Sequence, residues 1–254
     1  MTGLPNDFVS IDPTFTILDP SKVEEACKAM IEATKKEEGV LYYGFVRTET
    51  TLLCVEAYKD GEAVKKHLEN VGPILTASLE AGTIKLDSLK IQGPKEQLEI
   101  VKPATDPLGA EYYETIQEGI TFMQSMVGKE DTNKVMVSAY PIFTVPDWPK
   151  AEEQLKQFIA DTSAESKCHF YGFTKHDDKL ICRESYHSGE GLLEHLGVNG
   201  ERLGKCLEEG IIKLEVLKLL GPKEELEKLK EAGEPFGAIM MEYMGGFTRF
   251  SVRR

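Results

Sequence analysis

The stretch CRESYHSGEGLLEHL (182–196) nearly repeats the stretch CVEAYKDGEAVKKHL (54–68). The two begin 128 residues apart (182 − 54). This period is far above the roughly 20–50 residues of solenoid repeats, so the chain of 254 residues is predicted to be one domain duplicated in tandem. The same offset, without a gap, relates two further pairs of identical pieces: Tyr43-Gly44-Phe45 with Tyr171-Gly172-Phe173, and Gly93-Pro94-Lys95-Glu96 with Gly221-Pro222-Lys223-Glu224.

Each repeat is predicted to follow the order β-α-β-β-α-β with a small additional helix. In the second copy, Ala151, Leu155, Phe158 and Ile159 recur at helical spacing behind the N-cap candidate Asp147. Two β-rich runs around a polar His-Asp-Asp turn indicate a hairpin. This is the ferredoxin-like order. The expected elements are strands at 140–145, a hairpin at 168–186, strands at 211–221 and 236–246, and helices at 146–166, 189–210 and 222–233.

Two such sheets, each covered by helices on one face, can bury their open faces against each other. We therefore expect an α+β fold in which two ferredoxin-like (βαββαβ) repeats form an intramolecular dimeric α+β barrel, an internal pseudo-dimer. Further self-association stays open. The polar piece GKEDTNK is typical of a linker. The expected boundaries are an N-terminal extension at 1–13, repeat 1 at 14–120, a linker at 121–139 and repeat 2 at 140–254.

The composition excludes several classes of partner. A net charge of −13 and a pI near 5.0 disfavour a nucleic-acid surface, which needs a concentrated basic face. There is no run of about 18 apolar residues, so we expect no membrane span. The start MTGLPNDFVSID does not resemble a secretory signal, and the five cysteines show no CxxC spacing. These features favour the cytoplasm or a reducing organelle interior.

One face of a predicted strand is the same in both repeats, while the alternate residues differ. A core does not require a carboxylate, so the glutamate on this face needs a partner. His67 lies on the apolar stripe of the next helix, where it can reach the cleft between sheet and helix. A Glu–His pair beside a tyrosine would make a general base, or alternatively a hydrogen-bonded structural cluster. The identical residues are Leu52, Cys54, Glu56 and Tyr58, with Leu180, Cys182, Glu184 and Tyr186.

The candidate catalytic groups are repeated in both copies. The second copy also has polar residues where the first has apolar ones, and we predict substrate-binding roles for His169, Arg183 and Asn199; simple drift is the alternative. The sequence has no metal-ligand spacing such as HExxH and no GxGxxG, so we expect neither a metal nor another cofactor. The catalytic candidates are Tyr43, Glu56, Tyr58 and His67, with Tyr171, Glu184, Tyr186 and His195.

The order E-x-Y-x-x-x-E followed by His resembles the antibiotic-biosynthesis-monooxygenase-like group of dimeric α+β barrels, once in each repeat. The closing Gly-Gly-Phe-x-Arg and the Gly-Pro turns are similar to a branch of that group. The motif residues are Glu56, Tyr58, Glu62 and His67, Glu184, Tyr186, Glu190 and His195, and Gly245, Gly246, Phe247 and Arg249.

The resemblance implies a cofactor-independent monooxygenase that acts on a small apolar or aromatic ligand, here a phenolic, quinol or enolisable substrate. His195 would be the base, Glu184 its orienting partner, and Tyr171 and Tyr186 the hydroxyl donors. We expect both β-layers to tuck their Glu, Tyr and His side chains into one shared interior compartment. The alternative is a non-catalytic binding or assembly protein in which this cluster is structural. Fold alone does not decide between them.

Overall fold

The computed structural model describes residues 8–116, 119–121, 123–125 and 136–252. The first repeat contains β1 (Val9–Ile17), α1 (Pro20–Thr34), β2 (Val40–Arg47), β3 (Thr51–Tyr58), α2 (Gly61–Glu80), β4 (Ile84–Gly93), α3 (Lys95–Thr105), the short 3-10 helix η1 (Asp106–Leu108) and β5 (Glu111–Thr115). The second contains β8 (Ser138–Thr144), α4 (Trp148–Thr162), β9 (Cys168–His176), β10 (Lys179–Tyr186), α5 (Gly189–Glu208), β11 (Lys213–Gly221), α6 (Lys223–Gly233), η2 (Glu234–Phe236) and β12 (Ile239–Thr248). Three short strands complete the described chain: β6 (Ile120–Thr121), β7 (Met123–Ser125) and β13 (Phe250–Val252).

Helix boundaries follow the capping signals of the sequence. The Asp147 side chain accepts a hydrogen bond from the backbone N–H of Lys150, and Asp19 accepts one from Ser21 at the same place in the first repeat. Gly82 and Gly210 take left-handed φ values of 64° and 67° just after α2 and α5. The repeats therefore share their elements and also the local signals that begin and end them.

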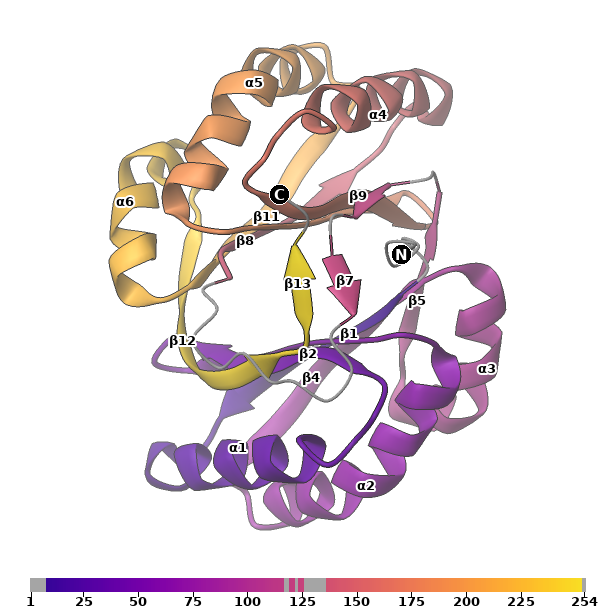
Figure 1. The fold of residues 1–254 in the computed structure, drawn as a ribbon, viewed down its shortest axis with the longest axis vertical. Helices are drawn as coiled ribbons and strands as arrows, with labels where there is room; N and C mark the ends of the chain where they lie inside the picture. Colours follow the sequence, from indigo (N-terminus) through magenta and orange to yellow (C-terminus); the bar gives the residue numbers. More distant parts are fainter. Residues whose placement is uncertain (1–7, 117–118, 122, 126–135, 253–254) are drawn as a thin grey trace.

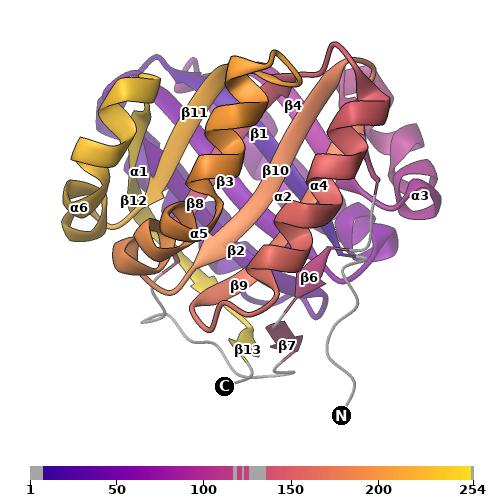
Figure 2. The same ribbon diagram turned by 90° about the horizontal axis from the view of Figure 1, so that it is seen from above.

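The strands of both repeats close into one barrel. Ten strands run β10-β8-β11-β12-β2-β3-β1-β4-β5-β9, and β9 pairs back to β10. Two strands cross between the repeats, because β12 pairs with β2 and β5 pairs with β9. Figures 1 and 2 show α1, α2 and α3 outside one half of the barrel and α4, α5 and α6 outside the other. The predicted intramolecular dimeric α+β barrel is confirmed.

The equivalent strands β3 and β10 each have two largely buried faces, which pack against different layers. Residues such as Cys54 and Cys182 pack under the helices in the core of their own repeat. The alternate residues, such as Leu53 and Ile181, pack with residues of the other repeat inside the barrel. The barrel thus separates a helix-side layer in each repeat from one interior shared by both.

The closing Gly-Gly-Phe-x-Arg motif joins β12 to the first repeat. Gly246 pairs with Gly44, after a shift of register between Tyr243 and Gly245. The Arg249 guanidinium donates to the backbone carbonyls of Lys35 and Glu37, just beyond the end of α1. The motif therefore has a structural role at the junction of the two repeats.

The strands begin earlier than the predicted domain ranges. β1 begins at Val9, within the predicted extension 1–13, and Val137 already bridges to Tyr186 within the predicted linker 121–139. The piece GKEDTNK lies outside the described residues. The division into extension, repeats and linker stays a prediction.

No helix in the described ranges is long and apolar enough to cross a membrane. All five cysteines are buried free thiols.

Candidate active site

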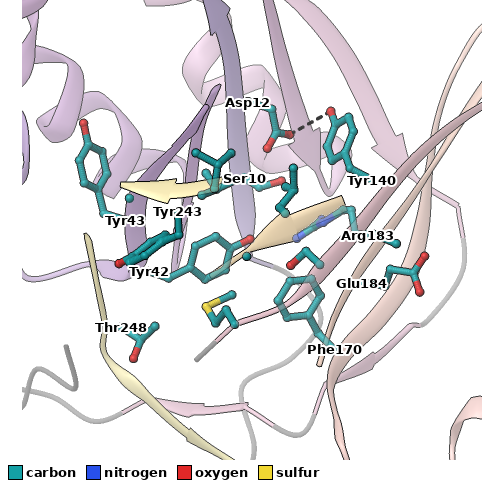
Figure 3. Close-up of a pocket in the computed structure, with 18 of the residues that line it drawn as sticks. Ser10, Asp12, Tyr42, Tyr43, Tyr140, Phe170, Arg183, Glu184, Tyr243 and Thr248 are labelled. Atoms are coloured by element: carbon teal, nitrogen blue, oxygen red, sulfur yellow. Dashed lines mark hydrogen bonds between the residues drawn. The ribbon is translucent and has the colours of Figure 1, made fainter. Parts of the chain in front are cut away.

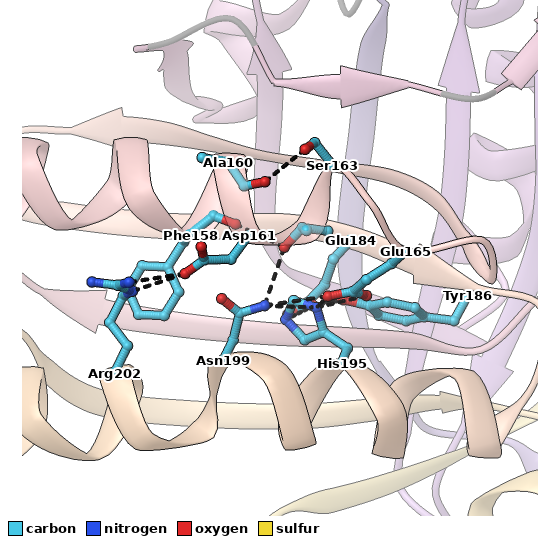
Figure 4. A network of polar contacts seen from close by, with 11 residues as sticks. Phe158, Ala160, Asp161, Ser163, Glu165, Glu184, Tyr186, His195, Asn199 and Arg202 are labelled. Carbon is cyan, nitrogen blue, oxygen red and sulfur yellow. Dashed lines mark hydrogen bonds and ion pairs between the residues drawn. The ribbon is translucent and has the colours of Figure 1, made fainter.

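His195 stands between two carboxylates in the helix-side layer of the second repeat (Figure 4). It projects from α5, and its Nε2 lies 3.6 Å from Oε2 of Glu184 on β10. Tyr186, also on β10, donates its hydroxyl to the same carboxylate. The rings of Tyr171 and His195 have centroids 5.0 Å apart. The structure therefore brings together all four predicted catalytic groups of this repeat, in the cleft between sheet and helix.

Sequence reasoning missed the fifth member of the cluster, Glu165. Its Oε1 lies 2.9 Å from Nδ1 of His195, and Glu165 lies in the middle of the loop between α4 and β9. The corresponding residue of the first repeat is Glu37, an identical glutamate at the offset of 128. That identity was a usable signal, because exposed loop residues rarely stay the same without a partner.

The first repeat contains the same arrangement with a tighter pair. The Nε2 atom of His67 lies 3.2 Å from Oε2 of Glu56, and its Nδ1 lies 3.1 Å from Oε1 of Glu37. Tyr58 donates its hydroxyl to Glu56. Both ring nitrogens of each histidine therefore face a carboxylate.

The carboxylates and the imidazoles shift each other's protonation. Burial raises the pKa of Glu184, and the neighbouring His195 opposes only part of this shift. Burial lowers the pKa of His195, but Glu165 and Glu184 outweigh burial, so the net pKa is raised. The same directions hold for Glu56 and His67. In each cluster the carboxylates therefore favour the protonated form of the imidazole. Within the described ranges, no group of three or more His, Cys, Asp and Glu side chains is arranged to hold a metal ion.

A cavity of about 100 Å³ adjoins the second cluster, lined by Tyr171, Glu184, His195 and Asn199 among apolar side chains. Two of the residues that line it are smaller than their equivalents in the first repeat: Ala139 replaces Ile11, and Gly233 replaces Thr105. The cavity therefore follows from small side chains that only the second repeat carries.

The side chain of Asn199 lines this cavity and has one hydrogen-bonding atom without a partner among the described residues. Its Nδ2 lies within 3.3 Å of Glu165, Thr162 and His195, but its buried Oδ1 has no hydrogen-bond partner among the described residues. A buried acceptor without a partner costs stability unless something binds to it. Asn199 thus lies where we predicted a substrate-binding residue, and it offers an acceptor to a ligand.

Three expectations differ from the structure. The Glu–Tyr–His clusters do not share one interior compartment; each is enclosed between the sheet and the helices of its own repeat. Period-two alternation places Arg183 on the opposite face from Glu184, and it lies inside the barrel. His169 lines neither cavity: its Nδ1 lies 3.3 Å from the Ser185 hydroxyl, and its ring packs on His187 and Phe250.

Comparisons with known proteins find a family match over part of the first repeat. The model of the family "Antibiotic biosynthesis monooxygenase" matches residues 20–71, a range that contains Glu37, Glu56, Tyr58 and His67. No curated protein matches the sequence.

Solved structures give the extent of the fold. A candidate monooxygenase from Lactobacillus acidophilus is 11% identical over 98% of this chain and 100% of its own, with a TM-score of 0.57. Another from Fusobacterium nucleatum is 16% identical over 86% of this chain and 95% of its own, with a TM-score of 0.56. MupZ from Pseudomonas fluorescens is 26% identical over 44% of this chain and 93% of its own, with a TM-score of 0.42. The chain therefore carries a match to the antibiotic-biosynthesis-monooxygenase family model in its first repeat, and its fold over nearly the whole chain is that of a dimeric α+β barrel.

Proposed function

We propose that the helix-side cavity of the second repeat binds a phenolic, quinol or enolisable substrate, and that His195 starts its cofactor-independent oxygenation there. The observation that carries the proposal is the cavity itself, which places an imidazole, a carboxylate and an unsatisfied amide oxygen against an otherwise apolar wall. A dry pocket with a few convergent polar groups is the usual form of a small-molecule site.

The two carboxylates beside His195 take different roles. Glu165 Oε1 lies 2.9 Å from Nδ1 of His195 and accepts a hydrogen bond from the Nδ1–H group. This keeps the proton on Nδ1, so the lone pair of Nε2 can act as the base. The orienting role thus passes from Glu184 to Glu165. Glu184, 3.6 Å from Nε2, stabilises the imidazolium that forms when His195 takes the substrate proton. A raised pKa makes His195 a stronger base, active once it is neutral.

The remaining steps need only the substrate and O₂. Removal of the phenol or enol proton gives an electron-rich carbanion, which forms a C–O bond with O₂. The peroxide O–O bond then breaks: one oxygen stays as a carbonyl in place of two hydrogens, and the other leaves as water. Tyr171 lines the cavity and can donate its hydroxyl to the developing oxyanion, while the free Oδ1 of Asn199 can accept a hydrogen bond from a substrate hydroxyl. Tyr186, predicted as a donor, already gives its hydroxyl to Glu184.

One observation favours a non-catalytic role instead. Both ring nitrogens of His67 and of His195 face carboxylates, as expected of clusters that lock helix to sheet. Under this second candidate function the cavity binds a ligand without turning it over, or the protein serves in assembly.

Oxygen uptake by His195→Gln and His67→Gln distinguishes the two functions, because the two histidines have matched surroundings. Anthrone-like and quinol compounds serve as substrates, with circular dichroism as the check on folding. We expect the wild type and His67→Gln to consume O₂ alike, and His195→Gln to lose activity by about 10²-fold or more. Uptake that is equally absent from all three proteins, or equally present, would count against the oxygenase.

A further inference from the structure

A second cavity, of about 170 Å³, lies inside the barrel between the two sheets (Figure 3). Its polar wall comes from Ser10 and Asp12 on β1, Gln92 on β4, Tyr140 on β8 and Arg183 on β10. The backbones of Tyr43 and Glu184 also line it, but their phenol and carboxylate groups point away, toward the helix-side layers (Figure 3). The two cavities are therefore separate sites on opposite faces of the same strand.

This interior holds an uneven pair of charges. Burial raises the pKa of Asp12 to about 6, against the hydrogen bond from Gln92 and the charge of Arg183. Arg183 is buried, with its guanidinium carbon 3.8 Å from the ring centre of Phe8. Only its Nη2 makes a hydrogen bond within the described residues, to the Phe8 carbonyl at 3.2 Å. A guanidinium has five N–H donors, so most of the donors of Arg183 remain for a ligand.

A further donor and two aromatic walls complete the lining. The Ser10 hydroxyl is buried and has no hydrogen-bond partner in the described chain. Tyr42 and Phe170, from equivalent positions of the two repeats, stack with an interplanar angle of 3° and centroids 6.0 Å apart. Tyr243 also lines the cavity.

The polar residues of this cavity are not repeated. At the offset of 128 residues, Arg183 is equivalent to Val55, Asp12 to Tyr140, and Gln92 to Leu220. In a dimer of identical chains, every polar residue of this interior would be present twice, once from each chain. The duplicated chain carries one cation and one acid there, which makes the interior asymmetric. An asymmetric, partly unsatisfied polar lining between aromatic walls is the form of a ligand site rather than of a core.

We propose that the interior cavity is a second binding site, distinct from the one beside His195, which takes a small aromatic carboxylate. The carboxylate accepts hydrogen bonds from Arg183 and Ser10, and its ring lies among Tyr42, Phe170 and Val55. A cavity of about 150 Å³ is enough for a benzene ring, so this one accommodates a single substituted ring. The acid Asp12 supplies a proton donor to the ligand when it is neutral.

Isothermal titration of the full chain with benzoate tests the site, with benzyl alcohol as the uncharged analogue. We expect benzoate to bind more tightly than benzyl alcohol. Arg183→Met should weaken benzoate by about tenfold or more, since a charge-assisted hydrogen bond is lost. Ser10→Ala removes a hydroxyl that has no partner in the free protein, so it should fold normally and bind benzoate more weakly. His195→Gln should bind benzoate as the wild type does.

The variants also separate this site from the proposed active site. Loss of benzoate in His195→Gln but not in Arg183→Met would place the ligand in the helix-side cavity and overturn the proposal, while leaving the proposed oxygenase intact. No benzoate binding by the wild type at millimolar concentration would overturn it as well. If Arg183→Met does not fold, the comparison of Ser10→Ala with wild type decides: equal affinities for benzoate contradict the proposal.

Discussion

The Tyr140 hydroxyl lies 3.4 Å from Oδ2 of Asp12 inside the barrel, although the two residues hold equivalent positions of the two repeats, 128 residues apart. Equivalent residues of a pseudo-dimer meet only near its two-fold axis, so this pair marks that axis. In a dimer of identical chains, two Asp12 carboxylates would meet here and repel each other. Tandem duplication removed that constraint by allowing a tyrosine to face the acid.

Asp12→Asn should change how stability depends on pH. The folded pKa of Asp12 is about 6, above its usual 3.8, so the folded protein binds an extra proton between these values. The stability that Asp12 contributes is fully present below pH 3.8 and is lost as pH rises through about 6. The groups that face it are Gln92 and Lys90 from β4, Tyr140 from β8, Arg183 from β10 and Lys218 from β11.

Urea unfolding of both proteins between pH 3.5 and 8, at intervals of about half a unit, measures this term. The free energy of unfolding of wild type minus Asp12→Asn should fall by about 3 kcal/mol across the window, because one pKa unit corresponds to about 1.36 kcal/mol. Taking the difference cancels the other carboxylates of this acidic chain. A difference that stays flat between pH 4 and 7 would show that Asp12 titrates normally.

The sequence predicted the layers of the fold but not which residues face which layer. Period-two alternation separated Glu184 from Arg183, and the offset of 128 supplied the pseudo-dimer. Both strand faces are buried in a closed barrel, so hydrophobicity could not indicate that Glu184 faces helices and Arg183 faces the other sheet. Asp12 was missed because it was assigned to the predicted N-terminal extension 1–13 and because its counterpart, Tyr140, is not an acid. Comparing the repeats for identical residues finds the features that both share. The polar residues of the interior cavity differ between the repeats, so this comparison could not find them.

Removing either member of the Glu–His pair of the first repeat should lower the free energy of unfolding. Removing both members should cost less than the sum of the two single changes. His67→Gln removes the imidazole partner of the buried Glu56 and the half-buried Glu37, which we expect to cost roughly 3–5 kcal/mol. Glu56→Gln should also destabilise, because Tyr58 and His67 then face a neutral amide with one acceptor atom in place of a carboxylate with two. The double variant should lose less stability than the sum of the two single variants, since each single change leaves the other side chain without its partner.

Chemical unfolding of the wild type, both single variants and the double variant at neutral pH gives the coupling energy. Costs that add within about 0.5 kcal/mol would contradict a coupled pair. Because the folded pKa of His67 is raised, its stabilising contribution is fully present below its unfolded pKa and is lost as pH rises through the folded value. The cost of His67→Gln should therefore shrink toward alkaline pH.

Ala139→Ile should fill the helix-side cavity of the second repeat. The first repeat carries Ile11 at this position, so the backbone already accepts the larger side chain in an equivalent setting. The filled cavity should raise the free energy of unfolding by about 1–2 kcal/mol and abolish ligand binding beside His195. Thermal unfolding and the O₂-uptake assay measure the two effects.

Ile11→Ala is the matched reverse change. Ile11 is buried in the first core, so its truncation should leave a new cavity and cost roughly 2–5 kcal/mol. Equal destabilisation by Ala139→Ile and Ile11→Ala would mean that the second repeat has no usable space at this position.

Gly246→Ala should weaken the junction where β12 crosses to the first repeat. A Cβ at Gly246 would lie 2.2 Å from the Tyr43 carbonyl oxygen, and the residue has a φ of 153°, so neither side can yield without losing the pairing with Gly44. We expect a loss of roughly 3 kcal/mol in the free energy of unfolding. Gly200→Ala, inside α5, is the control: nothing lies within 4 Å of its new Cβ, and the better helix former should add about 0.5–1 kcal/mol. Urea unfolding of both variants reports the contrast, and coincident midpoints would show that β12 does not need close backbone contact to hold the repeats together.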